Sequence, residues 1–178
     1  TPLYSSAASD VYKRQPFRRR IVAISFESAI PLPFETTSLG AGATQNQIME
    51  ALPGAQGLLL GGPLFTANSV PTRPGEIPSP YPAMGLDKGR TFPLSRLSGR
   101  VPDVSLALLP GASVGQAYSL GHLFAMLGVP TVLMPRQGPS DLMVTGPFFT
   151  AYAEAPPFEA LIAGQQEAGG RGEWISLG

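Results

Sequence analysis

The sequence contains no cysteine, one histidine and few charged residues among its 178 positions. The lack of cysteine excludes disulfide bonds, zinc–thiolate centres and thiol nucleophiles. Charged residues make up 13% of the chain, about half the share that is typical of soluble domains. No apolar run approaches the length of about 18 residues that a membrane-spanning helix requires. The expected class is therefore one globular domain, long enough to bury a core.

The formal net charge is zero, but the charges are unevenly distributed along the chain. Five of the twelve basic residues precede Ile21, which leaves seven basic residues against eleven acidic ones in the rest of the chain. This mildly acidic body argues against a broad nucleic-acid surface, so no nucleic-acid partner is expected. The basic residues 18–20 are interpreted as a solvated run before a strand. Peripheral contact with a membrane surface is the alternative.

The first fifteen residues show no hydrophobic periodicity and join abruptly to a basic and then apolar stretch. Residues 5–15 (SSAASDVYKRQ) resemble the translated read-through of a sequencing adapter. We therefore expect residues 1–15 to be a non-native tail and residues 16–178 to form the domain. A native, disordered tail is the alternative. On the first interpretation the natural N-terminal sequence is missing.

Short apolar runs alternate with helical patterns along the body of the chain. The apolar runs predict buried strands at residues 20–26, 57–62 and 129–134. The helical patterns predict helices at residues 45–52, 120–127 and 157–166. Runs that are continuously apolar, rather than alternating, are typical of parallel strands that are buried on both faces. The sequence thus predicts an α/β fold, a Rossmann-like parallel sheet with flanking helices.

Other stretches carry weaker or ambiguous patterns. Residues 31–44 and the proline-rich residues 63–93 predict loops, the second of them long enough to be an insertion. Residues 103–109 (DVSLALL) predict a helix with Asp103 as its N-cap, and a short strand is expected around residues 112–114.

The densest group of motifs lies between residues 115 and 148. His122 is followed by Gly128 and then by Pro-Thr-Val at 130–132; Gly-Pro-Ser-Asp occupies 138–141 and Gly-Pro occupies 146–147. Upstream, residues 47–64 contain an expected helix and strand that end in Gly61, Gly62 and Pro63. In this order and spacing the motifs are similar to those of glycosyltransferase family 9, which includes the ADP-heptose:lipopolysaccharide heptosyltransferases. The resemblance covers residues 18–158.

The resemblance implies the C-terminal half of a two-domain GT-B glycosyltransferase. Such an enzyme transfers a heptose-like sugar, with inversion, from a nucleotide diphosphate donor to a lipopolysaccharide-type acceptor. The implied ligand is an ADP-sugar, and no metal or other cofactor is implied. The acceptor-binding N-terminal domain, which carries the catalytic base, would be a missing partner. The implied location is the cytoplasm or the inner face of the inner membrane, and we expect the chain to be inactive alone.

Seven residues are candidates for contacts with the nucleotide sugar. They lie in or near the segments that follow expected strands: Gly61, Gly62, Ser119, His122, Gly138, Ser140 and Asp141. Ligands of open parallel sheets bind at the carboxyl ends of strands, and helix N-termini attract phosphate. We expect His122 and Ser140 to donate to phosphate oxygens, and Asp141 to cap a helix or contact a ribose. The purely structural interpretation of these residues is a surface histidine, two loop turns and a helix cap.

The positions at which this sequence departs from the family pattern define the alternatives to the glycosyltransferase interpretation. The family's Asp-Ser/Thr-Gly falls on Ala117, Tyr118 and Ser119, so a non-catalytic, degenerate Rossmann-like domain is one alternative. Phosphodiester glycosidase domains provide a second resemblance, through the turns at residues 60–65 and 136–144. Leu60 and Arg136 replace the Asn and Asp of that family. An out-of-frame translation is a further alternative, and it predicts no cooperative fold.

Overall fold

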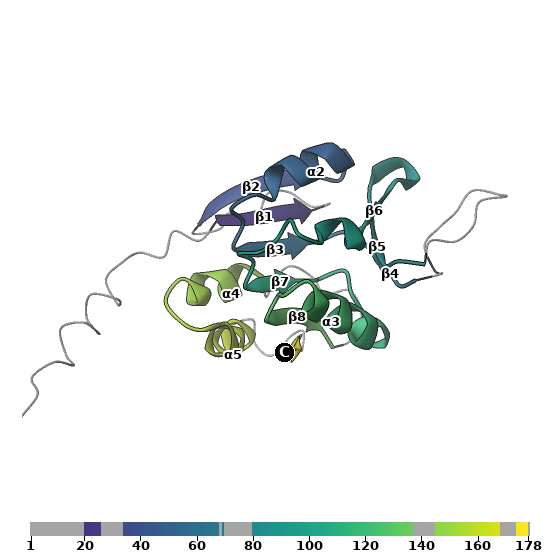
Figure 1. The fold of residues 1–178 in the computed structure, drawn as a ribbon. Helices are drawn as coiled ribbons and strands as arrows, with labels where there is room; N and C mark the ends of the chain where they lie inside the picture. Colours follow the sequence, from purple (N-terminus) through teal and green to yellow (C-terminus); the bar gives the residue numbers. More distant parts are fainter. Residues whose placement is uncertain are drawn as a thin grey trace, which may run out of the picture.

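A six-stranded sheet forms the centre of the computed structural model, which describes residues 20–25, 34–67, 69, 80–136, 145–167 and 174–177 (Figure 1). The strand order is β2-β1-β3-β7-β8-β9. The first five strands of this order are parallel and β9 is antiparallel to β8. The predicted Rossmann-like α/β fold with a parallel sheet and flanking helices is therefore confirmed.

The strands of this main sheet are β1 (Arg20–Ser25), β2 (Glu35–Gly40), β3 (Gly57–Leu60), β7 (Leu106–Leu108), β8 (Thr131–Pro135) and β9 (Trp174–Leu177). The α-helices are α2 (Gln45–Ala51), α3 (Ala117–Met126), α4 (Thr145–Tyr152) and α5 (Pro157–Glu167). A small antiparallel sheet contains β4 (Leu64–Phe65), β5 (Ala83–Gly85) and β6 (Thr91–Pro93). Three short 3-10 helices are η1 (Asp87–Gly89), η2 (Leu94–Leu97) and η3 (Val114–Gln116).

Two hydrophobic clusters cover the two faces of the main sheet. Within β1, Val22 and Ile24 belong to one cluster whereas Ile21 and Ala23 belong to the other, because successive side chains of a strand point to opposite faces. The first cluster includes residues of α2, α3 and the small sheet, and the second includes residues of α4 and α5. Burial on both faces explains why the predicted strands are continuously apolar.

Helix α2 is positioned by a capping box and one apolar side. Thr44 is its N-cap: the hydroxyl accepts from the Gln47 backbone N–H at 3.2 Å, and the Gln47 side chain accepts from the Thr44 N–H at 2.8 Å. Ile48 and Ala51 are buried against the sheet. These two signals confirm the helix predicted at 45–52. Helix α5 confirms the prediction at 157–166, and α3 begins three residues earlier than predicted.

Helices α4 and α5 pack closely on the second face. Gly164 of α5 has no space for a side chain, because a Cβ there would lie 2.9 Å from the backbone nitrogen of Phe148 in α4. Phe148, Phe149 and Tyr152 form an aromatic cluster that extends to Phe34, with Phe34 and Phe149 edge to face at a centroid distance of 5.9 Å. The second layer is thus held by aromatic contacts between residues that are far apart in the sequence.

The structure corrects four predictions of local structure. Residues 35–40, predicted to be loop, form the edge strand β2, which gains hydrogen-bond partners only by pairing with β1. The segment 103–109 is not a helix: residues 106–108 form β7 between β3 and β8, and the exposed Asp103 lies in a turn. The strand expected at 112–114 is absent from this described segment, which leads through a turn into η3.

The proline-rich segment 63–93 was predicted to be a loop, but it contains β4, β5 and β6 of the small sheet. The run LALL at residues 106–109 was mistaken for part of a helix, because the period of four apolar residues cannot distinguish a helix from a buried strand.

No helix among the described residues is both long enough and apolar enough to cross a membrane.

Candidate functional site

The loops that follow the parallel strands lie together at one edge of the sheet, here called the carboxyl edge. Among the described residues they are 41–44 after β2, 61–63 after β3, 109–116 after β7 and Arg136 after β8. Parallel strands bring these loops to the same side, and this edge is where open α/β sheets bind ligands. The carboxyl edge is therefore the candidate site (Figure 1).

Two glycines bring the β3 and β7 loops into backbone contact. A Cβ at Gly111 would lie 2.1 Å from the carbonyl oxygen of Gly62, so only glycine fits there. Gly61 is held in line with β1, since its N–H donates to the carbonyl oxygen of Ile24 at 2.7 Å. The glycines therefore make one packed backbone surface at this edge.

Gln116 fastens the start of α3 to the small sheet. Its side-chain oxygen accepts from the Ser113 N–H at 2.9 Å and from the Ser113 hydroxyl at 3.2 Å. Its side-chain amide donates to the carbonyl oxygen of Leu64 at 2.5 Å. The loop before α3 and the strand β4 are thus joined through one side chain, which satisfies backbone groups that the regular elements leave open.

The β2 loop is covered by the hairpin of the small sheet. The Asp87 N–H donates to the carbonyl oxygen of Ala41 at 2.9 Å, and the Arg90 guanidinium donates to that of Gly42 at 3.0 Å. The Gln45 side-chain amide donates to the carbonyl oxygen of Thr91 at 2.7 Å. This end of the carboxyl edge is therefore covered by the small sheet.

Arg136 is the one charged residue within the described loops of the carboxyl edge, and it is exposed. It follows the buried Pro135, the last residue of β8. In the sequence, Arg136 stands out only as a replacement in the phosphodiester glycosidase pattern. Its place after β8, the neighbour of β7, becomes visible only when the sheet is assembled.

The structure divides the seven predicted site residues into three groups. Gly61 and Gly62 lie at the carboxyl end of β3 as expected. Ser119 and His122 lie together on α3, in its first and second turns, and both are exposed, whereas Leu120 and Phe124 of the same helix are buried. Gly138, Ser140 and Asp141 lie outside the described residues, as does the adapter-like segment 5–15.

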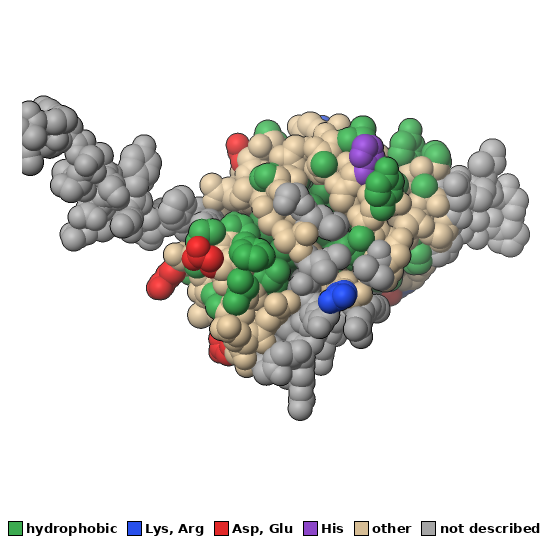
Figure 2. Space-filling model, turned by 90° about the horizontal axis from the view of Figure 1, so that it is seen from below, with side chains coloured by type: hydrophobic (Ala, Val, Ile, Leu, Met, Phe, Trp, Pro, Cys, Tyr) green, Lys and Arg blue, Asp and Glu red, His purple; other side chains and the backbone are tan. Residues whose placement is uncertain are grey.

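The exposed side of α3 is apolar and aromatic. Tyr118 is 87% exposed and Met126 is 74% exposed, and the rings of Tyr118 and His122 stack at a centroid distance of 6.4 Å with an interplanar angle of 5°. These three residues are four apart, so they share one side of the helix. Figure 2 shows the histidine beside hydrophobic side chains on the surface. His122 thus stands on an aromatic helix surface, one helical turn beyond the loop before α3.

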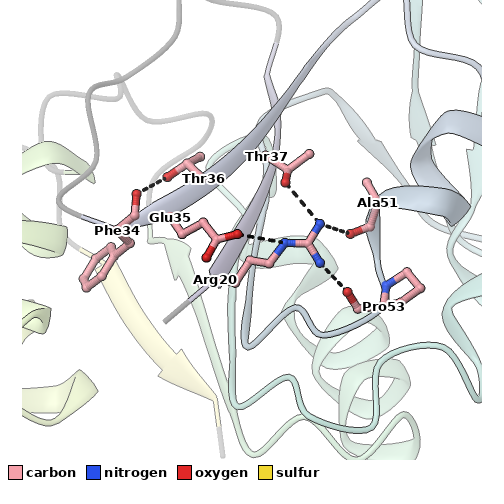
Figure 3. A network of polar contacts seen from close by, with 7 residues as sticks. All are labelled: Arg20, Phe34, Glu35, Thr36, Thr37, Ala51 and Pro53. Atoms are coloured by element: carbon pink, nitrogen blue, oxygen red, sulfur yellow. Dashed lines mark hydrogen bonds and ion pairs between the residues drawn. The ribbon is translucent and has the colours of Figure 1, made fainter. Parts of the chain in front are cut away.

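The opposite edge, here called the amino edge, carries an arginine with several hydrogen bonds. Arg20 donates to the carbonyl oxygens of Pro53 and Ala51, the latter at 3.1 Å, and to the Thr37 hydroxyl at 3.2 Å (Figure 3). Its Nε lies 4.0 Å from an oxygen of Glu35. Arg20, interpreted from the sequence as part of a solvated run, therefore ties β1 to the end of α2 and to β2. The carbonyl partners, more than 30 residues away, could not be inferred from the local sequence.

Within the part of the chain that the structure describes, no group of three or more His, Asp or Glu side chains is placed to hold a metal ion. The described loops of the carboxyl edge contain one cationic residue, Arg136, and no acidic residue. No protein-family model matches this chain, and the search of curated proteins finds no significant match.

Proposed function

We propose that this chain is the nucleotide-sugar-binding half of a glycosyltransferase that resembles family 9. The observation that carries the proposal is the position of Gly61 and Gly62. The chain passes from β1 to β2 on one side and then to β3 on the other side, so the strand order reverses between β1 and β3. Ligands of open α/β sheets bind outside the carboxyl ends of strands at this reversal, and the Gly61–Gly62 turn lies there.

The proposed ligand is a nucleotide diphosphate sugar, with an ADP-sugar as the first candidate. Glycine turns allow the backbone to approach a diphosphate, and backbone N–H groups can stabilise the negative charge that develops on it as the sugar leaves. Ser119, His122, Gly138, Ser140 and Asp141 remain proposed contacts. The proposal names no cofactor, as in the sequence resemblance.

The complete enzyme would transfer a heptose-like sugar to a lipopolysaccharide-type acceptor in the cytoplasm, with at most peripheral contact with the inner membrane. Acceptor binding and the catalytic base would come from a second domain outside these 178 residues. The chain alone should therefore bind the donor without transferring the sugar. Sugar transfer by the purified chain would contradict this part of the proposal.

Ligand-dependent stability tests the proposal directly. We expect ADP and ADP-sugars to raise the midpoint of thermal unfolding, because a ligand at about 100 times its Kd stabilises the native state by about 2.7 kcal/mol. For a domain of this size that corresponds to a rise of several degrees. UDP and UDP-sugars test which nucleobase the site prefers, and inorganic phosphate is the control. Cooperative unfolding that none of these nucleotides shifts would overturn the proposal.

A non-catalytic Rossmann-like domain is the second candidate, because Ser119 and His122 occupy the exposed side of α3 rather than the glycine loops. The variant His122→Ala separates the two functions. A donor-binding site that includes His122 predicts weaker ADP binding in the variant at unchanged stability. A purely structural domain predicts no nucleotide binding in either protein.

A further inference from the structure

Strand β2 is the first strand of the main sheet, and its outer side has no partner strand among the described residues. It pairs with β1 in one continuous register from Glu35 to Gly40, without a bulge. Ser38 and Gly40 are exposed, and a Cβ added at Gly40 would meet nothing within 4 Å. Figure 1 shows β2 on the outer side of β1. Ser38 and Gly40 therefore lie on an open side of the sheet.

The hydrogen bonds of β1 show which backbone groups of β2 point outward. The carbonyl oxygen of Ile24 accepts from the Gly61 N–H at 2.7 Å, on the side of β3. Successive residues of a strand direct their N–H and C=O groups to opposite sides, so those of Ala23 point towards β2. Ala23 is paired with Ser38, and in a parallel pair only one of two partnered residues directs its groups into the pair. The N–H and C=O groups of Ser38, and by the same alternation those of Thr36, point away from β1.

The sequence of β2 lacks the features that usually block an open strand. Edge strands of native proteins are protected by lysine, by proline or by bulges. The strand ETTSLG has no proline and no basic residue, and its one charged residue, Glu35, stands at its first position. Its two threonines favour extended backbone. Outward N–H and C=O groups on such a strand are a template for a further extended segment.

We propose that β2 pairs antiparallel with β2 of a second copy of this chain, so that the main sheet continues across a two-fold axis. With Thr37 at the axis, Thr36 of each copy lies opposite Ser38 of the other, and each of these pairs exchanges both of its N–H···O bonds. The same register places Glu35 opposite Leu39, so no like charges face each other. The occupant is a second copy because the strand complements itself in hydrogen bonding and in charge. This pairing does not depend on nucleotide binding.

Sedimentation equilibrium of the full chain, from about 1 µM to about 0.5 mM, tests the proposal, because an interface of one strand is small and its dimer is weak. Ser38→Pro removes the outward N–H but keeps the pairing with β1, since proline is tolerated where the N–H of an edge strand faces solvent. Ser38→Lys keeps the N–H and adds the charge that protects natural edges. Ser98→Lys is the matched control, because Ser98 is an exposed serine in the turn after η2.

We expect the wild type to dimerise as its concentration rises. Ser38→Pro should weaken the dimer by about 10-fold or more, because each copy loses an N–H···O bond to the other. Ser38→Lys should weaken it less, and Ser98→Lys should leave it unchanged. The unfolding midpoint shows whether each variant is folded, and Ser38→Lys provides the measurement if Ser38→Pro is not.

Three outcomes of these measurements would overturn the proposal. The first is a wild type that stays monomeric throughout the concentration range. The second is a dimer that neither substitution of Ser38 weakens. The third is an equal loss in Ser98→Lys and Ser38→Lys, which would show a general effect of added charge.

Amide hydrogen exchange locates the interface. In the monomer the Thr36 and Ser38 amides should exchange faster than the Thr37 amide, which points towards β1. When about nine-tenths of the chain is dimeric, their exchange should slow by about 10-fold, because only the monomer leaves them open to water. A dimer that leaves both amides unprotected would place the interface elsewhere, and protection already present in the monomer would mean that the strand is covered. Either result would contradict the proposal.

Discussion

The two edges of the main sheet are held together in different ways. At the amino edge, one charged side chain, that of Arg20, donates to two carbonyl oxygens and a hydroxyl. At the carboxyl edge, the loops meet backbone to backbone at Gly62 and Gly111, and the neutral Gln116 joins them to the small sheet. The amino edge is thus joined by a charged side chain, whereas the described contacts of the carboxyl edge are made by backbone groups and a neutral side chain.

This difference teaches how each edge responds to substitution. At the amino edge the loss of one side chain removes several hydrogen bonds at once, and the carbonyl oxygens that it served lose a charged donor. At the carboxyl edge the backbones of two loops are in direct contact, so even one added methyl group must displace backbone. The first edge is therefore sensitive to removal of a side chain and the second to addition of one.

The largest expected effect comes from a methyl group at the glycine contact. Gly111→Ala should destabilise the fold by about 3 kcal/mol, at the upper end of the range for overpacking, because the backbone oxygen of Gly62 cannot move as a flexible side chain can. Gly115→Ala is the matched control: the nearest atom to its Cβ is the Ser113 hydroxyl, at 4.0 Å. Urea denaturation measures the free energy of unfolding of both variants. Equal stability of the two variants would show that the loops are not in contact.

Removal of the arginine at the amino edge should have the next largest effect. Arg20→Ala should cost about 2 kcal/mol, since the carbonyl oxygens of Ala51 and Pro53 lose a charged donor. The side chain of Glu35 is 71% exposed, so the ion pair contributes little. Glu35→Gln should therefore change the free energy of unfolding by less than about 0.5 kcal/mol. A cost for Glu35→Gln as large as that for Arg20→Ala would assign the stability to the ion pair instead.

The smallest of these effects is expected at Gln116. In Gln116→Glu the carboxylate can still accept from Ser113 but cannot donate to the carbonyl oxygen of Leu64. The loss of this hydrogen bond should cost about 1 kcal/mol. Thermal unfolding at neutral pH checks the value, with Gln45→Glu as the control that removes the analogous bond to Thr91. An unchanged midpoint for Gln116→Glu would mean that the contact with Leu64 does not hold the small sheet in place.

The local sequence was sufficient where burial is continuous and strong. The run at residues 57–60 is buried at every position, and such a run can only be an internal element. Helix α2 carries both its cap at Thr44 and its apolar side in adjacent residues. Strand β2 was missed because its Thr and Ser residues are polar and partly exposed at an edge. Strand β7 was mistaken for a helix because three or four apolar residues carry no decisive period.

The candidate site was predictable only in part. Gly61 and Gly62 were found because they directly follow a recognisable strand. The role of Gly111 depends on Gly62, 49 positions earlier in the sequence. His122 was selected by motif spacing, but its exposure on the aromatic side of α3 is a property of helix packing. Residues near in sequence were therefore easier to group than residues on neighbouring strands.

By itself, the sequence determined that the chain forms a parallel α/β sheet, because continuous apolar runs require burial on both faces. It also determined where the glycine turn after β3 lies. Only the tertiary structure decided that Arg20 is part of the scaffold and that Gly62 and Gly111 touch. The physical reason is that these positions are set by pairing between strands that are distant in the sequence, and no local propensity encodes that pairing.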